Sequence, residues 1–228
     1  MVGSGKYSDL CVFSFHPVKI IAGGEGGMIT TNSKKLYQKL IKLRTHGVSQ
    51  NTNEIFNKNV AYTGNQKNLW YYEMTDLGYH YRQTDIHCAL IYSQMNRIHD
   101  FLSKRKKIAQ IYDKHFIKNN NYYLPQSNLR GFSSNHLYTL NYNFKKNKIS
   151  RNHLMDELQK RNIITQVHYI PVPLQYYYKK MGYNMNNLEN ALLHYNECIS
   201  LPIYYDLTRE QQRFVIESVD EILQKKNK

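Results

Sequence analysis

The sequence has few cysteines, and none of them are paired. Cys11, Cys88 and Cys198 are odd in number, lie far apart and show no CxxC spacing. Disulfide frameworks use an even set of cysteines, and zinc sites use closely paired ones. The pattern therefore disfavours both kinds of site and predicts three buried, reduced thiols with no bound metal.

Long apolar runs are missing as well. No segment reaches the roughly 18 uninterrupted apolar residues that a membrane-spanning helix needs. Residues 1–6 lack the charged start and apolar centre of a signal peptide. The expected location is the cytoplasm, and no membrane partner is expected.

Acidic residues are the scarcer charge, because 17 Asp and Glu stand against 31 Lys and Arg, for a formal net charge of +14. Such an excess fits a nucleic-acid surface, an anionic small substrate or a compositional bias without any ligand. The lysines are spread along the whole chain, which favours compositional bias. The basic run 104–107 falls on a predicted helix with an apolar opposite face, so we interpret it as a solvated face. Nucleic acid is therefore not an expected partner, and a nucleic-acid-binding module is the minor alternative.

The chain has 228 residues, of which 41% are apolar, so it can form one large domain or one and a half ordinary ones. Apolar runs that alternate with helix-period segments predict an α/β fold. A polar, Asn-rich segment at 48–68 indicates an active-site loop or a mobile excursion. The helix at 85–116 is expected to be continuous or broken once. The periodicities predict strands at 10–15, 27–31, 136–144 and 163–169, and helices at 33–46, 85–116, 150–160, 188–199 and 208–223.

The residues that best suit covalent chemistry lie near the start of the chain. Lys19 follows an apolar strand and Pro17, and it precedes the glycine-rich stretch 23–27. A lysine that attacks a carbonyl must be neutral, which burial beside a phosphate-bearing aldehyde cofactor favours. The glycines allow close approach of another group, and Ser14 is placed to donate its hydroxyl to a phosphate oxygen. On spacing alone, an ordinary surface lysine in a glycine-rich turn explains the pattern better.

Further segments to consider with this loop are VFSFHPVK at 12–19, GEGG at 24–27, and residues 43–47, 70–74, 77–86, 166–171 and 200–204. Together these segments resemble the DegT/DnrJ/EryC1/StrS family of sugar aminotransferases, which are fold-type I enzymes that use pyridoxal 5′-phosphate. The resemblance covers nearly the whole chain. Within the family, the segments most resemble the transaminases of pseudaminic acid biosynthesis, which aminate C4 of a UDP-linked 4-keto-6-deoxy amino sugar with glutamate as donor.

The resemblance implies roles for the residues that match the family's cofactor site. Lys19 would hold the cofactor covalently and act as the general base that moves the substrate proton. Ser14 would bind the cofactor phosphate. His80 stands where most relatives carry an asparagine that reaches the phosphate of the partner subunit's cofactor, so the sequence departs from the family there.

Three further residues in family-like segments are candidate substrate contacts, namely Arg82, His168 and Tyr169. A cation and ring donors suit a pyrophosphate or sugar hydroxyls. A structural ion pair explains Arg82 equally well, and packing within a strand explains the other two.

The resemblance also implies the architecture and the partners. Residues 1–117 would form the C-terminal part of an incomplete large domain that includes the long helix, and residues 118–228 a small α/β domain. Relatives carry an N-terminal segment that supplies an acid for the ring nitrogen, a stacked aromatic ring and a phosphate cradle, so the cofactor pocket is expected to be incomplete here. The expected partners are a second subunit in a homodimer and a separately encoded N-terminal half. An inactive truncated remnant is the alternative.

Overall fold

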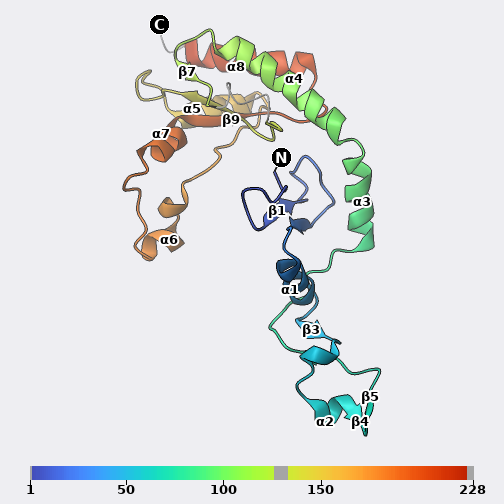
Figure 1. Ribbon diagram of the computed structural model, residues 1–228. Coiled ribbons are helices and arrows are strands. Elements are labelled where there is room, and N and C mark those ends of the chain that lie inside the picture. Colours follow the sequence, from blue (N-terminus) through green and yellow to red (C-terminus); the bar gives the residue numbers. More distant parts are fainter. Residues whose placement is uncertain (1, 126–132, 225–228) are drawn as a thin grey trace. The chain divides into compact units, whose positions relative to one another are not determined.

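The computed structural model describes residues 2–125 and 133–224. The chain groups into two compact units, Met1–Arg97 and Ile98–Lys228. Each unit combines helices with antiparallel strand pairs, which are drawn in Figure 1. This mixture agrees with the α/β class that the sequence predicts.

The first unit opens with a two-stranded hairpin. β1 (Cys11–Ser14) pairs antiparallel with β2 (Gly27–Thr30). α1 (Lys34–Arg44) follows, because the hydroxyl of Ser33 accepts a backbone hydrogen bond and caps its first turn. The helix ends before Gly47, which has a positive φ of 67°. The strands and the helix predicted for this region are confirmed.

The segment after α1 is not one irregular loop, so the loop predicted at 48–68 is wrong. Asparagine side chains supply local hydrogen bonds: Asn51 Oδ1 accepts from the Asn53 N–H, and Asn68 Nδ2 donates to the Val60 carbonyl. β3 pairs with β6 and β4 with β5, both antiparallel. The short elements are β3 (Val48–Ser49), η1 (Thr52–Glu54), α2 (Lys58–Ala61), β4 (Tyr62–Thr63), β5 (Gln66–Lys67) and β6 (Glu73–Met74).

The long helix predicted at 85–116 is present with one break. α3 (Asp85–Met95) begins after Thr84, whose side chain caps it, and α4 (Ile98–Phe116) starts after the break. The two compact units divide at the same point, so α4 belongs with the second unit. The domain boundary near residue 117 stays a prediction.

The second unit is built on a three-stranded antiparallel sheet in the order β7-β8-β9. Every residue of β8 and β9 is buried, so both faces of these two strands are covered. Side chains from α4, α5 and α8 join the sheet in one apolar core cluster. The bounds of the new elements are β7 (Tyr122–Tyr123), β8 (Tyr138–Tyr142), β9 (Cys198–Leu201), α5 (Arg151–Lys160) and α8 (Arg209–Gln224).

The strand predicted at 163–169 is wrong. Only Gln166 pairs there, in a single bridge to β9. Ile163 belongs to the end of α5, because Asn162 has a φ of 59° and the Ile163 N–H donates to the Leu158 carbonyl at 2.9 Å. This is the Schellman arrangement, in which an apolar residue beyond the helix packs back on it.

The helix predicted at 188–199 is too long at its C-terminal end. α7 (Glu189–Glu197) stops before Cys198, where β9 begins. Pairing with β8 fixes these residues as a strand, so tertiary contacts override the helical spacing. η3 (Val172–Leu174) and α6 (Tyr176–Lys180) lie between α5 and α7.

All three cysteines are free thiols, but only Cys198 is buried. Cys11 is half-buried and Cys88 lies exposed on α3, so the prediction of three buried thiols is wrong for these two. Their elements belong to the first unit, where few side chains cover them. Among the described residues, no group of three or more His, Cys, Asp or Glu side chains could hold a metal ion. No helix in the same residues is long and apolar enough to cross a bilayer.

The two units differ in how well their apolar side chains are covered. The second unit has the large core cluster described above. The first unit leaves Leu69 93%, Ile86 75% and Trp70 68% exposed. Folded proteins normally cover apolar surface of this extent with another segment or chain. The buried apolar side chains of the first unit are few, namely Phe15, Ile21, Ile55, Ala61, Tyr71 and Ile91.

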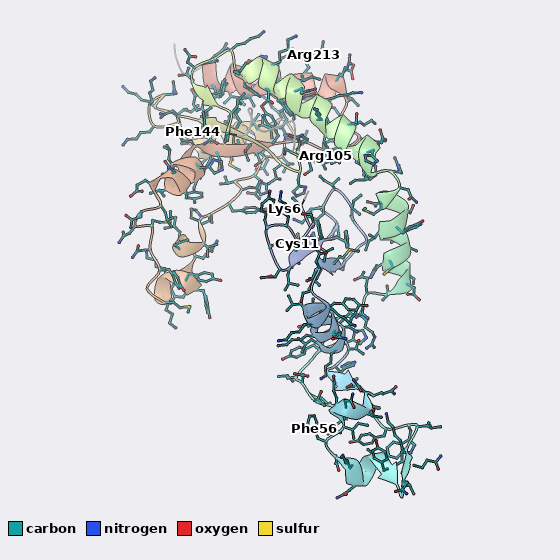
Figure 2. The ribbon with its side chains drawn as sticks, in the orientation of Figure 1. Lys6, Cys11, Phe56, Arg105, Phe144 and Arg213 are labelled. Carbon is teal, nitrogen blue, oxygen red and sulfur yellow. The ribbon has the colours of Figure 1, made fainter. Side chains whose placement is uncertain are left out.

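Arg105 is a buried cation within the basic run 104–107 (Figure 2). Its Nη1 donates to the carbonyls of Asn135, His136 and Ile203 at 3.2, 3.1 and 3.1 Å. Burial lowers the pKa of its guanidinium. The prediction of a solvated face is therefore wrong for Arg105, which ties α4 to two other segments of the second unit.

Replacing Arg105 with methionine should destabilise the second unit by about 2–4 kcal/mol, because three carbonyls lose a charged donor. Urea unfolding followed by circular dichroism measures the change. The exposed neighbour Lys106 provides the matched control, since Lys106→Met should change stability by less than about 0.5 kcal/mol. Equal effects of the two substitutions would show that the buried hydrogen bonds contribute nothing.

Candidate active site

Lys19 lies in the loop that connects β1 to β2. The Phe15 N–H donates to the Gly26 carbonyl at 2.8 Å, and the Gly23 N–H donates back to the Phe15 carbonyl at 2.9 Å, so the loop closes on itself. The Lys19 N–H bonds to the His16 carbonyl at 2.9 Å, which sets the bend that carries its side chain. Lys19 is half-buried, and no Asp or Glu of the described residues forms an ion pair with it. Its amine is therefore not held by a carboxylate.

Helix α3 and the turn before it hold the same loop in place. The side chain of Gln94 accepts from the Ala22 N–H at 3.0 Å, and that of Gln83 donates to the Glu25 carbonyl at 2.6 Å. A Cβ on Gly23 would lie 2.4 Å from Ile91 Cγ1. The close approach that the glycines were predicted to allow is thus made by α3.

Ser14 ends β1 and is exposed. Its Oγ accepts a long hydrogen bond of 3.4 Å from the His16 N–H, which leaves the hydroxyl proton free to donate elsewhere. An amine and a hydroxyl therefore come from one strand and the loop that follows it. Their roles toward a cofactor stay predictions.

His80 and Arg82 lie on the strand-like segment 76–82, which runs along the end of α1. The Tyr79 and Tyr81 N–H groups donate to the carbonyls of Leu43 and Arg44 at 3.2 and 3.0 Å. His80 forms a bridge with Thr45 and packs its ring edge-on against His46, with centroids 5.5 Å apart. Both His80 and Arg82 are exposed, so they are free to meet a ligand or another chain.

Sequence reasoning missed the contacts that fix this segment. Gly47 and Gly78 meet so closely that a Cβ on Gly47 would lie 1.8 Å from the Asp76 carbonyl oxygen, and one on Gly78 would lie 2.3 Å from the Gly47 nitrogen. Gly47 also has a positive φ of 67°, so its backbone ends α1 and makes this contact as well. The sequence shows that positions 47 and 78 are both glycine, but it does not show that the two glycines meet.

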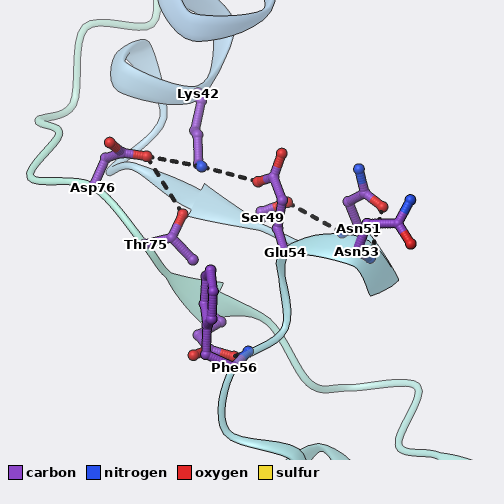
Figure 3. A network of polar contacts seen from close by, with 9 residues as sticks. Lys42, Ser49, Asn51, Asn53, Glu54, Phe56, Thr75 and Asp76 are labelled. Carbon is purple, nitrogen blue, oxygen red and sulfur yellow. Dashed lines mark hydrogen bonds and ion pairs between the residues drawn. The ribbon is translucent and has the colours of Figure 1, made fainter.

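An ion network ties α1 to η1 and to the segment that follows β6 (Figure 3). Lys42 Nζ lies 2.9 Å from Glu54 Oε2 and 2.8 Å from Asp76 Oδ2. Hydrogen bonds from Lys42 lower the pKa of both carboxyls, and the same bonds raise the pKa of Lys42. The network therefore fixes the start of the segment that carries His80 and Arg82.

The remaining two candidates lie in the second unit. His168 Nδ1 lies 2.7 Å from Ser200 Oγ, and its ring packs edge-on against Tyr169 with centroids 4.5 Å apart. Tyr169 is exposed. Within the first unit the structure places Lys19, Ser14, His80 and Arg82, while His168 and Tyr169 belong to the other unit.

The chain belongs to the DegT/DnrJ/EryC1/StrS aminotransferase family, whose model matches residues 2–220. It is 34% identical over 226 residues to the UDP-4-amino-4,6-dideoxy-N-acetyl-beta-L-altrosamine transaminase of Campylobacter jejuni, covering 98% of this chain and 55% of that protein. It is 33% identical over 221 residues to the spore coat polysaccharide biosynthesis protein SpsC of Bacillus subtilis, covering 96% of this chain and 55% of that protein. The chain thus spans about half the length of the curated relatives it matches.

Solved structures give the same result. Helicobacter pylori PseC, an aminotransferase of pseudaminic acid biosynthesis, superposes with a TM-score of 0.83 at 29% identity, covering 97% of this chain and 55% of that one. The sugar aminotransferase Spr1654 of Streptococcus pneumoniae in its PLP form gives 0.79 at 28% identity, covering 98% and 54%. The fold is that of the C-terminal part of a fold-type I aminotransferase, as the resemblance implied.

The glycine contact yields a matched pair of substitutions. Gly47→Ala should destabilise the first unit by about 3 kcal/mol or more, because the new Cβ clashes with the Asp76 carbonyl and also meets the left-handed backbone. Gly64 has a similar φ of 59°, but no atom of the described residues lies within 4 Å of its Cβ position. Gly64→Ala should therefore cost only the backbone strain, about 1–2 kcal/mol. Denaturant unfolding compares them, and equal costs would refute the importance of the close contact.

The ion network predicts a pH window for the order of segment 76–82. Its carboxyls have lowered pKa values, so their contribution is present above pH 4 to 5 and is lost as the pH falls through the folded values, below about 4. Lys42 has a raised pKa, so its contribution is lost only as the pH rises beyond about 10.5. Protection factors from amide hydrogen exchange at Tyr79 and Tyr81 should be constant from pH 5 to 8 and fall below about pH 4.

Substitution of the central cation tests the same network at neutral pH. Lys42→Met should lower the protection of Tyr79 and Tyr81 at pH 7, whereas Lys35→Met, on an exposed position of α1, should leave it unchanged. Unchanged protection in Lys42→Met would mean that the backbone bonds alone hold the segment.

Proposed function

We propose that this chain is the C-terminal part of a pyridoxal-phosphate-dependent aminotransferase that transfers the amino group of glutamate to a UDP-linked 4-keto-6-deoxy amino sugar. The observation that carries the proposal is the β1–β2 loop, which presents Lys19 without a carboxylate partner and is braced by α3. Support for the substrate comes from the relative in Campylobacter jejuni, whose name describes a UDP-sugar transaminase. Cytoplasmic location is part of the same proposal.

The side chains on this loop fit the proposed cofactor. Lys19 offers a primary amine to an aldehyde, and Ser14 offers a hydroxyl donor to a phosphate oxygen. His80 is exposed and offers a ring N–H, which suits the phosphate of a partner subunit's cofactor. When bound, pyridoxal phosphate supplies a carbonyl for covalent attachment and a ring that withdraws electrons from the substrate carbon.

Lys19 has two tasks in this proposal. Its amine would hold the cofactor between turnovers, and its Nζ would then move a proton between the substrate carbon that carries the nitrogen and C4′ of the cofactor. Both tasks need a neutral amine at a fixed position. The short backbone bonds of the loop and its contacts with α3 provide that position.

Arg82, His168 and Tyr169 are the proposed contacts to the sugar nucleotide. The guanidinium of Arg82 is exposed and suits a pyrophosphate, because a planar cation binds two phosphate oxygens at once. Tyr169 is exposed, and the ring of His168 bonds to Ser200, so both side chains are proposed to meet sugar hydroxyls.

The proposed enzyme works with two further partners, an N-terminal portion of the same enzyme and a second subunit. Relatives are almost twice as long as this chain, and the apolar side chains of the first unit lack cover. Burying that apolar surface would stabilise the first unit, which has little core of its own.

Lys19→Ala should abolish both the colour of the bound cofactor and turnover when the chain is co-expressed with an N-terminal portion. We expect a loss of at least about 10³-fold in kcat, since the general base is removed. Absorbance spectra and an amination assay on UDP-linked 4-keto sugars measure the two effects. Lys35→Ala, an exposed lysine of the same unit, is the control and should keep both.

Retention of colour or turnover by Lys19→Ala would remove Lys19 from this role. The chain without the N-terminal portion should give little stable cofactor absorbance. Full turnover by the chain alone would contradict the need for that partner, and absence of turnover with the partner present would favour an inactive remnant.

A further inference from the structure

Polar side chains also gather in a groove between α4 and α8, in the second unit. A cavity of about 560 Å³ opens there, and a second one of about 550 Å³ adjoins it along the same two helices. Small-molecule sites usually have volumes of this order. The groove consists entirely of residues of the second unit, and none of them is a candidate for transamination.

Cations dominate the walls of this cavity. Lys104, Lys107 and Lys114 come from α4 and Arg209 from the start of α8, and among the described residues that line the cavity Asp206 is the single acid. Among the described residues, none of the four cations has a carboxylate within ion-pair distance. Like charges gathered at one hollow repel one another, and an anionic ligand removes that repulsion.

The floor is apolar with one polar group. Ile108, Ile111 and Leu207 line it, and Gln212 lies beneath them with only 2% of its surface exposed. Gln212 Nε2 donates to the Ile108 carbonyl at 2.8 Å, while no described residue donates to its carboxamide oxygen. That oxygen is available to accept from a hydroxyl or an N–H of a ligand.

One wall of the cavity is the aromatic ring of Tyr205. The ring of Tyr205 lies below the ammonium of Lys104, which is 3.8 Å from the ring centroid. This contact holds Lys104 at the rim by a cation–π interaction. An apolar floor, one acceptor and a rim of cations suit a ligand with a ring at one end and phosphate at the other.

We propose that this groove binds a phosphate-bearing small molecule of nucleotide size. Its phosphates contact Lys107, Lys114 and Arg209, and its ring lies over Ile108 and Ile111. The proposal is independent of the transamination reaction, because it involves neither Lys19 nor the first unit.

The test uses the full chain with methyl-labelled isoleucine, titrated with UDP at low ionic strength and followed by NMR. Saturable shifts should appear at the methyls of Ile108 and Ile111, while Ile199 in β9 should not move. Inorganic pyrophosphate should bind at the same two methyls with lower affinity, since it lacks the ring. Binding should weaken as salt is added.

Paired substitutions of equal charge separate a built site from general attraction. Lys107→Gln with Lys114→Gln should lower the affinity for UDP about tenfold, the combined effect of two partly exposed charge contacts. Lys106→Gln with Lys118→Gln removes the same charge from exposed positions outside the cavity and should leave the affinity unchanged. Equal weakening by both pairs, or shifts that do not saturate, would overturn the proposal. Tighter binding of a short single-stranded RNA at the same methyls would also overturn it, in favour of a nucleic-acid surface.

Discussion

The chemistry proposed for the first unit depends on the contact between α3 and the glycine-rich loop. A connection of this composition would sample many backbone conformations by itself, because glycine imposes few limits on φ and ψ. Gln94 and Gln83 bond to backbone atoms of the loop, and Ile91 fills the space that a side chain on Gly23 would occupy. These contacts therefore restrict the backbone of the loop, which its own glycines would leave free to vary. The position of Lys19 thus depends on residues that lie more than sixty positions further along the chain.

The two units are stabilised by different kinds of interaction. In the second unit, β8 is buried on both faces and Arg105 donates to carbonyls of two other segments. Contacts within the unit therefore stabilise its fold. In the first unit, a few polar and close backbone contacts fix the conformation, namely the Lys42 ion network, the Gly47 contact and the contacts of α3 with the β1–β2 loop. Such contacts fix backbone geometry but bury little apolar surface. A unit built this way presents well-defined side chains on a surface that is suited to a further chain.

The sequence predicted features whose cause is local and missed those whose cause is distant. Ser33, Thr84 and Ser150 each cap the helix that follows, and these helices begin within one residue of the starts predicted from the sequence, at 33, 85 and 150. The strand expected at 163–169 is absent, because Ile163 completes a Schellman cap on α5 and only Gln166 of these residues pairs with a strand. The first two residues of β9 were predicted as the end of a helix, since only pairing with β8 distinguishes the two states. For the candidate site, the resemblance supplied the candidate residues, whose roles stay predictions, and the contacts that hold them join segments far apart in sequence.

The basic run 104–107 illustrates why charge counted along a sequence is a poor guide to function. A helix turns by about 100° for each residue, so neighbours in the run face different surroundings. Arg105 turns inward and bonds to carbonyls, Lys106 faces solvent, and Lys104 and Lys107 line the groove beside α8. One stretch of like charge thus divides into a structural group, a solvated group and a candidate binding group. What matters to a ligand is the set of cations that share a surface, and here that set includes Lys114 and Arg209 from outside the run.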